Sequence, residues 1–243
     1  MSGINKLIIS CRNTEMNGAA DRIILKYEEE DWSTDTHLTE YFNSLKAENG
    51  KLQTAINRSK AQSELEEKDE IRDQNVRGIN HMLEAYLKFT DATIKAAAVF
   101  VNNVFSRYGV EIVKDSYVTE SSLINSMLED FSEADVQTEI AKLPGLAALI
   151  AELTTAQNNF ETARVAYETA VSVDDKMENA SKLRTSVGLI INEDIVQYLN
   201  VMAKLDAAKY AAFADAIGKT IDNTNEQIKK RRNGGDEPEE PNE

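Results

Sequence analysis

A polar segment near the middle of the chain carries residues that could form a buried ion-pair network or an anion site. It runs from Glu66 to Asp73 and reads EEKDEIRD. In a helix Asp69 and Asp73 lie one turn apart, within reach of Arg72. An arginine guanidinium binds carboxylates through charge-assisted N–H···O bonds, and it also binds small anions. We therefore take Asp69, Arg72 and Asp73 as the centre of a candidate polar cluster.

Arg184 is the fourth candidate residue of this cluster. It falls on Arg72 when the chain is aligned with itself, as described below. A buried arginine–carboxylate network can fix the register of packed helices. The same groups, left open to a concave surface, would instead bind a small ligand or anion. We favour the register interpretation, and a binding site or an enzyme at this cluster is the alternative.

Other arrangements that carry chemistry are missing from the sequence. A di-iron helix bundle needs Glu-x-x-His on two helices, but Thr34 and Gly78 stand where glutamate should precede His37 and His81. Two histidines and the single Cys11 are too few for a zinc site. The chain has no glycine-rich phosphate loop and no Gly-x-Ser-x-Gly turn. The sequence thus predicts no cofactor, no metal and no catalytic residue, and it favours a protein that is not an enzyme.

The charge of the chain restricts its partners. The 243 residues have a formal net charge of −15. Nucleic acids and anionic membrane surfaces attract clustered Lys and Arg, and the run from Lys229 to Arg232 is short and isolated. The N-terminus lacks a secretory signal of the usual form, and no segment has the roughly 18 apolar residues that cross a bilayer. We expect a soluble, cytoplasmic protein with no nucleic-acid or membrane partner, in which Cys11 is an inert structural thiol.

The elements that position the polar cluster are predicted to be helices. Pro144 is the one proline before the tail, where Pro238 and Pro241 lie. The stretch from Glu64 to Tyr108 predicts one helix of about 65 Å, which either starts in the polar residues 61–69 or continues through them. Its seam has steps of three or four residues and consists of Arg72, Val76, Ile79, Leu83, Tyr86, Thr90, Ile94, Ala97, Val101, Val104 and Tyr108. This seam predicts an all-α, elongated bundle of long antiparallel helices.

Capping signals predict where the other helices begin. The expected first residues or caps are Asn13 or Thr14, Asp35 or Thr36, Thr119, and Ser132. The cleanest apolar seam follows Pro144 and is typical of coiled-coil-like packing. It consists of Leu146, Leu149, Leu153, Ala156, Phe160, Ala163, Tyr167 and Ala170. Gly188 marks a possible joint, and the last helical region is expected to continue from Ile195 to Ile228.

An internal similarity suggests how the chain is divided. A shift of 108 residues places Leu38 on Leu146 and Leu45 on Leu153, and a small insertion then places Arg72 on Arg184. This pattern indicates two related three-helix halves, residues 1–115 and 116–233, packed as one bundle and followed by a disordered acidic tail, 234–243. The alternative is that two apolar seams of the same period coincide by chance.

Several different short motifs follow one another along the chain. They are Arg12-Asn13-Thr14-Glu15, Asp69-x-x-Arg72-Asp73, Ala85-Tyr86, Ser116-Tyr117, Glu120-Ser121-Ser122-Leu123-Ile124, Ala156-Gln157-Asn158-Asn159-Phe160-Glu161 and Gly234-Gly235. In this order the sequence resembles a family of uncharacterised all-helical proteins of gut-type anaerobic bacteria. The resemblance implies an all-α fold. It implies no activity, cofactor or catalytic residue.

Two functions follow from these observations. The first is a non-enzymatic interaction or scaffold protein, since long helices offer extended surfaces for a protein partner or for self-association. The second is a small-ligand or anion-binding protein, or an enzyme, at the cluster of Asp69, Arg72, Asp73 and Arg184. The first requires apolar surface that the bundle leaves uncovered, and the second requires the charged groups to converge on a concave site.

Overall fold

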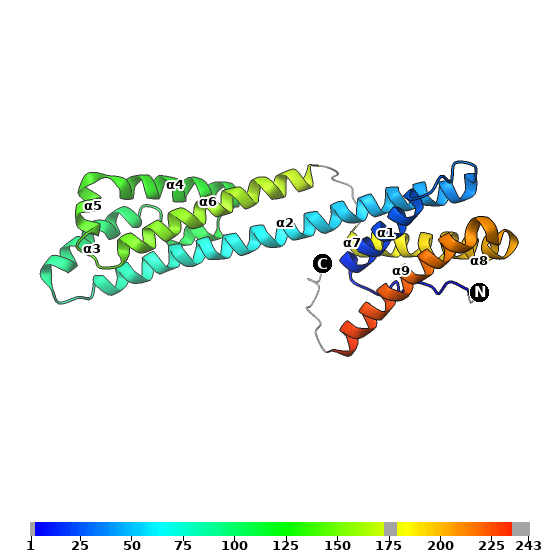
Figure 1. Ribbon diagram of the computed structural model, residues 1–243. Helices are drawn as coiled ribbons and strands as arrows, with labels where there is room; N and C mark the ends of the chain where they lie inside the picture. The colour runs from blue at the N-terminus through cyan, green and yellow to red at the C-terminus, as the bar shows by residue number, and fades with distance from the viewer. Residues whose placement is uncertain (1–2, 173–178, 235–243) are drawn as a thin grey trace. The chain divides into compact units, whose positions relative to one another are not determined.

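The computed structural model describes residues 3–172 and 179–234, and over these residues the protein is all α-helical and has no strand (Figure 1). Long helices pack against one another, which confirms the predicted fold class. The contacts divide the chain into two compact units, unit 1 with residues 1–59 and 174–243 and unit 2 with residues 60–173. Helix α2, Thr36–Tyr86, contributes its first part to unit 1 and its second part to unit 2.

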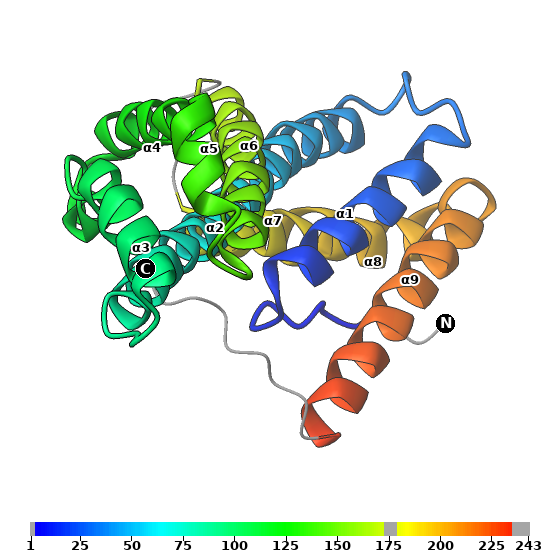
Figure 2. The same cartoon turned by 90° about the vertical axis from the view of Figure 1, so that its left-hand side faces the viewer.

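Unit 1 is built from helices at both ends of the chain. Besides α2 it contains α1 (Asn13–Glu28), α7 (Ala180–Leu189), a π-helical turn (Ile190–Ile195), α8 (Val196–Leu205) and α9 (Ala207–Asn233). Helix α1 packs beside α7 and α9, and α8 packs beside α9 (Figure 2). Fully buried aliphatic and aromatic side chains from these helices form one core, including Met16, Ile23, Phe42, Leu199, Ile217 and Ile221.

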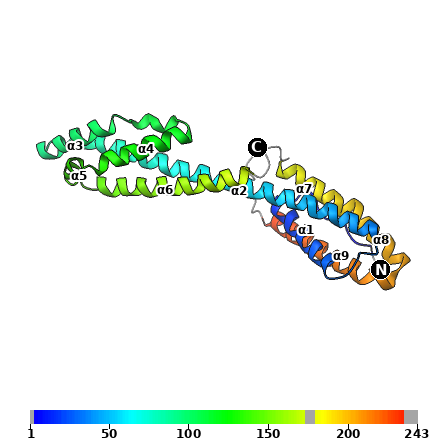
Figure 3. The same ribbon diagram turned by 90° about the horizontal axis from the view of Figure 1, so that it is seen from above.

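Unit 2 is built from the middle of the chain. It contains the second part of α2, α3 (Ala92–Phe105), a 3-10 turn (Val110–Lys114), α4 (Tyr117–Ser132), α5 (Ala134–Ile140) and α6 (Leu146–Val171). Helix α4 packs beside α3, α5 and α6 (Figure 3). Its main core includes Ile79, Leu83, Val101, Ile124, Met127 and Leu153.

The predicted helix from Glu64 to Tyr108 is wrong at its C-terminal end, and at its N-terminal end it continues through residues 61–69, one of the two expected alternatives. The helix already begins at Thr36, and it ends at Tyr86. A new helix, α3, begins after Asp91, whose carboxylate accepts hydrogen bonds from the backbone N–H groups of Thr93 and Ile94. The apolar period continues across this break because α2 and α3 both bury a face in the core of unit 2. The apolar period therefore did not reveal the turn between α2 and α3, where Asp91 caps the new helix.

Three other predicted boundaries also need correction. Ser116, and not Thr119, caps α4: the Ser116 hydroxyl accepts from the Thr119 N–H. Glu133, and not Ser132, precedes α5. The last helical region is interrupted at Asp206, whose carboxylate caps α9 through the Lys209 N–H. Ser116 and Asp206 cap their helices through side-chain hydrogen bonds, whereas Glu133 makes no such bond.

Other predictions are confirmed. Asp35 caps α2, since its Oδ1 accepts a hydrogen bond from the Leu38 N–H at 3.0 Å. The seam of α6 is buried at Leu146, Leu153 and Phe160, as expected for a close-packed helix. Gly145, directly before α6, has φ of 88°, a left-handed conformation that glycine adopts without strain.

The compact units do not follow the boundary expected at 115/116, because the second segment of unit 1 returns after residue 173. That boundary was based on the internal similarity of the sequence, which stays a prediction. In the expected tail, 234–243, only Gly234 is described, and residues 235–243 lie outside the described part of the chain. Among the described residues, no helix combines the length and apolarity that a membrane span requires.

Candidate functional site

The candidate site lies inside unit 2, where α2, α4 and α6 meet around Arg72. This arginine is fully buried. Its Nη2 donates to Asp69 Oδ1 at 2.6 Å and to Glu120 Oε2 at 2.5 Å. Its Nη1 donates to Ser121 Oγ at 3.0 Å and to Gln157 Oε1 at 3.3 Å. The guanidinium thus joins all three helices, and both terminal nitrogens have two partners each.

An aromatic ring holds the plane of this guanidinium. The Arg72 Cζ atom lies 3.6 Å from the centroid of the Phe160 ring. On the same ring Tyr117 packs edge-on, with centroids 5.2 Å apart. A buried cation over an aromatic face gains electrostatic energy in addition to packing. Phe160 is itself fully buried, so α6 supplies both a hydrogen-bond acceptor and a ring to Arg72.

Two carboxyl groups beside Arg72 face one another. Asp73 Oδ2 accepts from Arg77 Nη2 at 2.7 Å. Asp73 Oδ1 and Glu120 Oε1 are buried and receive no hydrogen bond from a standard donor. Together with Asp69, their carboxylate oxygens lie within 4.8 Å of one another. A shared proton between Asp73 and Glu120 would satisfy both oxygens.

The electrostatics of Glu120 agree with a shared proton. Burial raises the pKa of Glu120 to about 8; Arg72 lowers it, while Asp73 and Asp69 raise it. At neutral pH the Glu120 carboxyl is therefore mostly protonated and can donate to Asp73. The pKa of Asp69 is also raised, chiefly by its burial, against the effect of Arg72. Protonation of Glu120 removes the negative charge of one of the three carboxyl groups in the cluster.

This arrangement fits a proton better than a cation or an anion. A metal ion would have three carboxyl groups available, but Arg72 and Arg77 already occupy one oxygen of Asp69, one of Glu120 and one of Asp73. An anion would face carboxyl groups on the side where Arg72 donates. Chemically, the cluster can hold a proton and lock the register of α2, α4 and α6.

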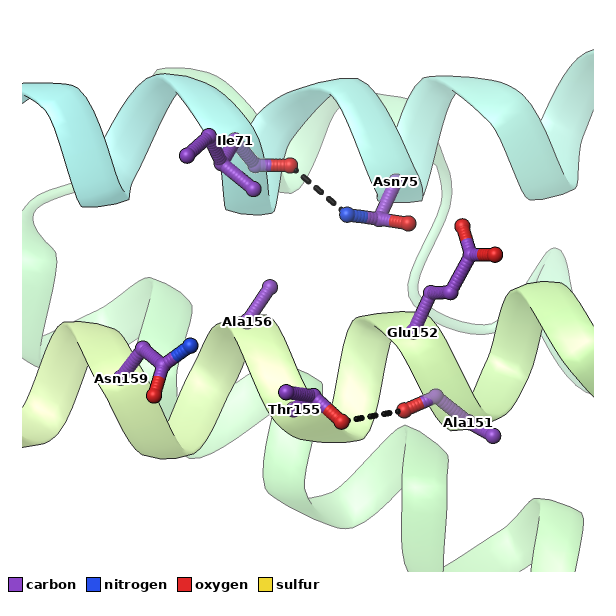
Figure 4. Close-up of a pocket in the computed structure, with 7 residues that line it drawn as sticks. All are labelled: Ile71, Asn75, Ala151, Glu152, Thr155, Ala156 and Asn159. Carbon is purple, nitrogen blue, oxygen red and sulfur yellow. Dashed lines mark hydrogen bonds between the residues drawn. The ribbon is translucent and has the colours of Figure 1, made fainter.

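A groove runs along the surface of unit 2 next to this cluster (Figure 4). Its cavity volume is about 400 Å³, and it lies between α2 and α6. Its floor and edges consist of Ile71, Asn75, Ala151, Glu152, Thr155, Ala156 and Asn159. Ala156 and Glu152 point from α6 toward α2, and Asn75 donates back to the Ile71 carbonyl at 2.9 Å. Small side chains on α6 therefore leave the groove open.

The structure brings together three of the four predicted residues. Asp69, Arg72 and Asp73 belong to unit 2, whereas Arg184 belongs to unit 1. Arg184 Nη1 donates to the Cys11 carbonyl at 2.9 Å and lies 3.4 Å from Asn13 Oδ1. It ties the start of α1 to α7. The self-alignment therefore paired two arginines that lie in different units, and Arg184, unlike Arg72, is only partly buried.

Sequence reasoning missed the partners that α4 and α6 supply. Glu120 and Ser121 look like ordinary first-turn residues of a helix, and Gln157 stands one position off an apolar seam. No spacing in the sequence marks them as buried, and only the structure shows that Glu120 and Gln157 are 1% and 2% exposed. Glu120, Ser121 and Gln157 lie in the short motifs 120–124 and 156–161, and the fold brings these two motifs together at Arg72.

Cys11 is buried in unit 1, in agreement with an inert structural thiol. Burial raises the pKa of the Cys11 thiol to about 11, Glu15 raises it further, and Arg184 opposes both. The thiolate is the reactive form of cysteine, and it is rare at neutral pH when the pKa is this high.

Comparison with known proteins places the chain in a family. Residues 62–225 match the model of a family described as "Family of unknown function (DUF6261)". Since this match covers more than half of the chain, the protein belongs to that family. The match includes Arg72, Glu120 and Gln157, and hence the whole polar cluster. No curated protein matches the chain, and no solved structure matches it.

Proposed function

We propose that the protein is a non-enzymatic interaction protein that binds a helical segment of a partner protein in the groove between α2 and α6. The observation that supports this proposal is the position of the groove. Ile71 and Ala156 line it, and their neighbours in the sequence, Arg72 and Gln157, form a buried hydrogen bond that joins the two helices of its walls. A rigid, open groove on helices is suited to recognition.

The chemistry of the groove indicates the kind of segment it would accept. Ala151, Thr155 and Ala156 are small, so a partner backbone can approach α6 closely. Ile71 is 40% exposed and offers apolar contact. Glu152 adds a negative charge at the edge of the groove, in a chain whose net charge is −15. An amphipathic helix with an apolar stripe and a flanking Lys or Arg is complementary to this surface.

The geometry gives less support to the alternative, a small-ligand or anion site or an enzyme at the cluster. Arg72 spends both terminal nitrogens on protein acceptors and is fully buried. The carboxyl groups around it would repel an anion. We also propose that the protein is cytoplasmic and that its relatives are proteins of gut-type anaerobic bacteria.

Affinity purification from the native cells, with crosslinking and mass spectrometry, tests this proposal. We expect a stoichiometric protein partner whose crosslinks converge on α2 and α6 of unit 2. The variant Ala151→Arg fills the groove and should abolish capture of that partner. Ala166→Arg is the matched control, because Ala166 is also exposed on α6 but does not line the groove.

The result that would overturn the proposal is equal capture of the partner by both variants, or no stoichiometric partner with either the wild type or the control. Thermal unfolding of both variants shows whether Ala151→Arg remains folded. Because Ala151 is exposed, its replacement should change stability by less than about 0.5 kcal/mol.

A further inference from the structure

The N-terminal segment before α1 lies outside any helix, and asparagine side chains of unit 1 bind its backbone. The segment comprises residues 4–9. Its partners are Asn192 on the π-helical turn, Asn200 on α8 and Asn225 on α9. Each of these asparagines makes two hydrogen bonds, one as acceptor and one as donor.

Two of these asparagines bind both backbone groups of a single residue. Asn192 Oδ1 accepts from the Leu7 N–H at 2.7 Å, and Asn192 Nδ2 donates to the Leu7 carbonyl at 2.9 Å. Asn200 binds Ile4 in the same way, at 2.6 Å and 3.3 Å. The N–H and C=O of one residue point to the same side only in strand-like backbone. The segment is therefore recognised in an extended conformation.

The third asparagine bridges two residues of the segment. Asn225 Oδ1 accepts from the Ile8 N–H, and Asn225 Nδ2 donates to the Lys6 carbonyl, both at 2.9 Å. Asn192 and Asn225 are 2% and 8% exposed. Polar groups buried to this extent need partners, and here the partners are supplied by the backbone of the segment.

Apolar side chains of the segment fit against unit 1. Leu7 is 2% exposed and belongs to the core of unit 1. Ile9 lies against Gly188, where an added Cβ would be 2.8 Å from Ile9 Cγ1. On the outer side, Lys6 Nζ pairs with Glu193 at 2.6 Å. The site thus has amides for the backbone, apolar contacts for the side chains of Ile4, Leu7 and Ile9, and a glycine that permits close approach.

The π-helical turn supports a binding role for this surface. It spans Ile190–Ile195 and places Asn192 toward the segment. Such turns are rare in helices and occur frequently at functional sites. Recognition of peptides in this manner takes affinity from main-chain hydrogen bonds and specificity from pockets for side chains.

We propose that unit 1 contains a binding site for an extended peptide, in which Asn192, Asn200 and Asn225 recognise the backbone. The chain's own residues 4–9 occupy this site. A peptide in trans with apolar residues at the positions of Ile4, Leu7 and Ile9 takes their place when they are released. The occupant in trans is the same segment of a second copy, because residues 4–9 are the sequence that makes these hydrogen bonds.

The test uses the full chain with Leu7→Asp, which places a charge in the apolar contact and releases the segment. The probe is a fluorescent peptide of residues 3–10, followed by fluorescence anisotropy. We expect Leu7→Asp to bind the peptide at least about tenfold more tightly than the wild type, whose site is occupied. A peptide that itself carries Leu7→Asp is the matched control and should not bind.

A second variant assigns the binding to the asparagines. Adding Asn225→Ala to the Leu7→Asp chain should weaken binding of the peptide at least about tenfold, because two backbone hydrogen bonds are lost. The exposed Asn158→Ala on α6 of unit 2 is the control and should leave the affinity unchanged.

Circular dichroism covers the case in which Leu7→Asp does not fold alone. Recovery of the helical signal on addition of the wild-type peptide, but not of the Leu7→Asp peptide, also supports the site. Equal affinity for the two peptides, no gain of affinity over the wild-type chain, or no recovery of an unfolded variant would overturn the proposal. It is independent of the α2–α6 groove, so Ala151→Arg should bind this peptide as the wild type does.

Discussion

Asp35 in unit 1 and Arg72 in unit 2 are both buried, one as the cap of α2 and the other within it, but they have opposite charge. In unit 1 the carboxylate of Asp35 receives hydrogen bonds from the hydroxyls of Tyr198 and Tyr210, the latter at 2.6 Å. In unit 2 the guanidinium of Arg72 is bound by Asp69 and Glu120. Unit 1 thus stabilises an anion with neutral donors, whereas unit 2 stabilises a cation with acids that can titrate.

This difference predicts opposite responses to pH. Burial opposes ionisation of Asp35, but hydrogen bonds from Tyr210, the Leu38 N–H and Tyr198 outweigh it and lower its pKa. The contribution of Asp35 to stability is present above its unfolded pKa and is lost in acid. The raised pKa of Glu120 acts in the other direction: its contribution is complete below the unfolded pKa and is lost as pH rises to about 8.

The largest expected effect is in unit 2, on removal of Arg72. Arg72→Ala leaves Glu120 and Asp69 without their cation, and we expect a loss of about 3–5 kcal/mol in the free energy of unfolding. Denaturant unfolding measures this loss, and hydrogen exchange by mass spectrometry should locate it in residues 60–173. Arg77→Ala, which removes a partly exposed ion pair, should cost less than about 1 kcal/mol. Equal losses for the two variants would show that Arg72 does not lock unit 2.

The corresponding change in unit 1 is Asp35→Ala. It removes the cap of α2 and leaves two tyrosine hydroxyls without an acceptor, so we expect a loss of about 2–4 kcal/mol. Faster hydrogen exchange should appear in α8 and α9. Asp31→Ala, in the same loop but exposed, is the control and should have little effect. If exchange accelerates in α4 and α6 as well, the two units do not respond separately.

Glu120→Gln sharpens the contrast in pH dependence. Glutamine resembles the protonated acid, so the variant should come close to the wild type near pH 5 and exceed its stability near pH 8 by about 3–4 kcal/mol. Thermal unfolding across this range measures the change. Glu129→Gln, an exposed position on α4, should keep the wild-type slope. A wild-type slope in Glu120→Gln would contradict the shared proton.

The smallest effect is expected from Gly188→Ala in unit 1. The new Cβ would lie 2.8 Å from Ile9 Cγ1, so the N-terminal segment must shift, at a cost of about 1–2 kcal/mol. Gly50→Ala is the matched control, because Gly50 lies within α2 and an added Cβ would meet no neighbouring side chain within 4 Å. It should stabilise the helix by about 0.5–1 kcal/mol. Melting temperatures that fall for both variants would contradict the close approach at Gly188.

The sequence predicted much of the helical architecture but less of the site. The seam of α6 and the Asp35 cap follow from local spacing, which each helix imposes on its own residues. The break at Asp91 was missed because an apolar period does not register a turn when both helices face the same core. A similarity of sequence pattern grouped Arg184 with Arg72. In the structure Arg184 instead binds the Cys11 carbonyl and the Asn13 side chain.

By itself, the sequence determined that this chain folds into helices and that Asp69, Arg72 and Asp73 lie on one face of one of them. Helix propensity and side-chain period act over a few residues, so these properties are local. Only the tertiary structure decided that Glu120, Gln157 and Phe160 surround Arg72, and that three asparagines bind the N-terminal segment. These contacts join residues far apart in the chain, and packing of the whole core, which no short pattern encodes, brings them together.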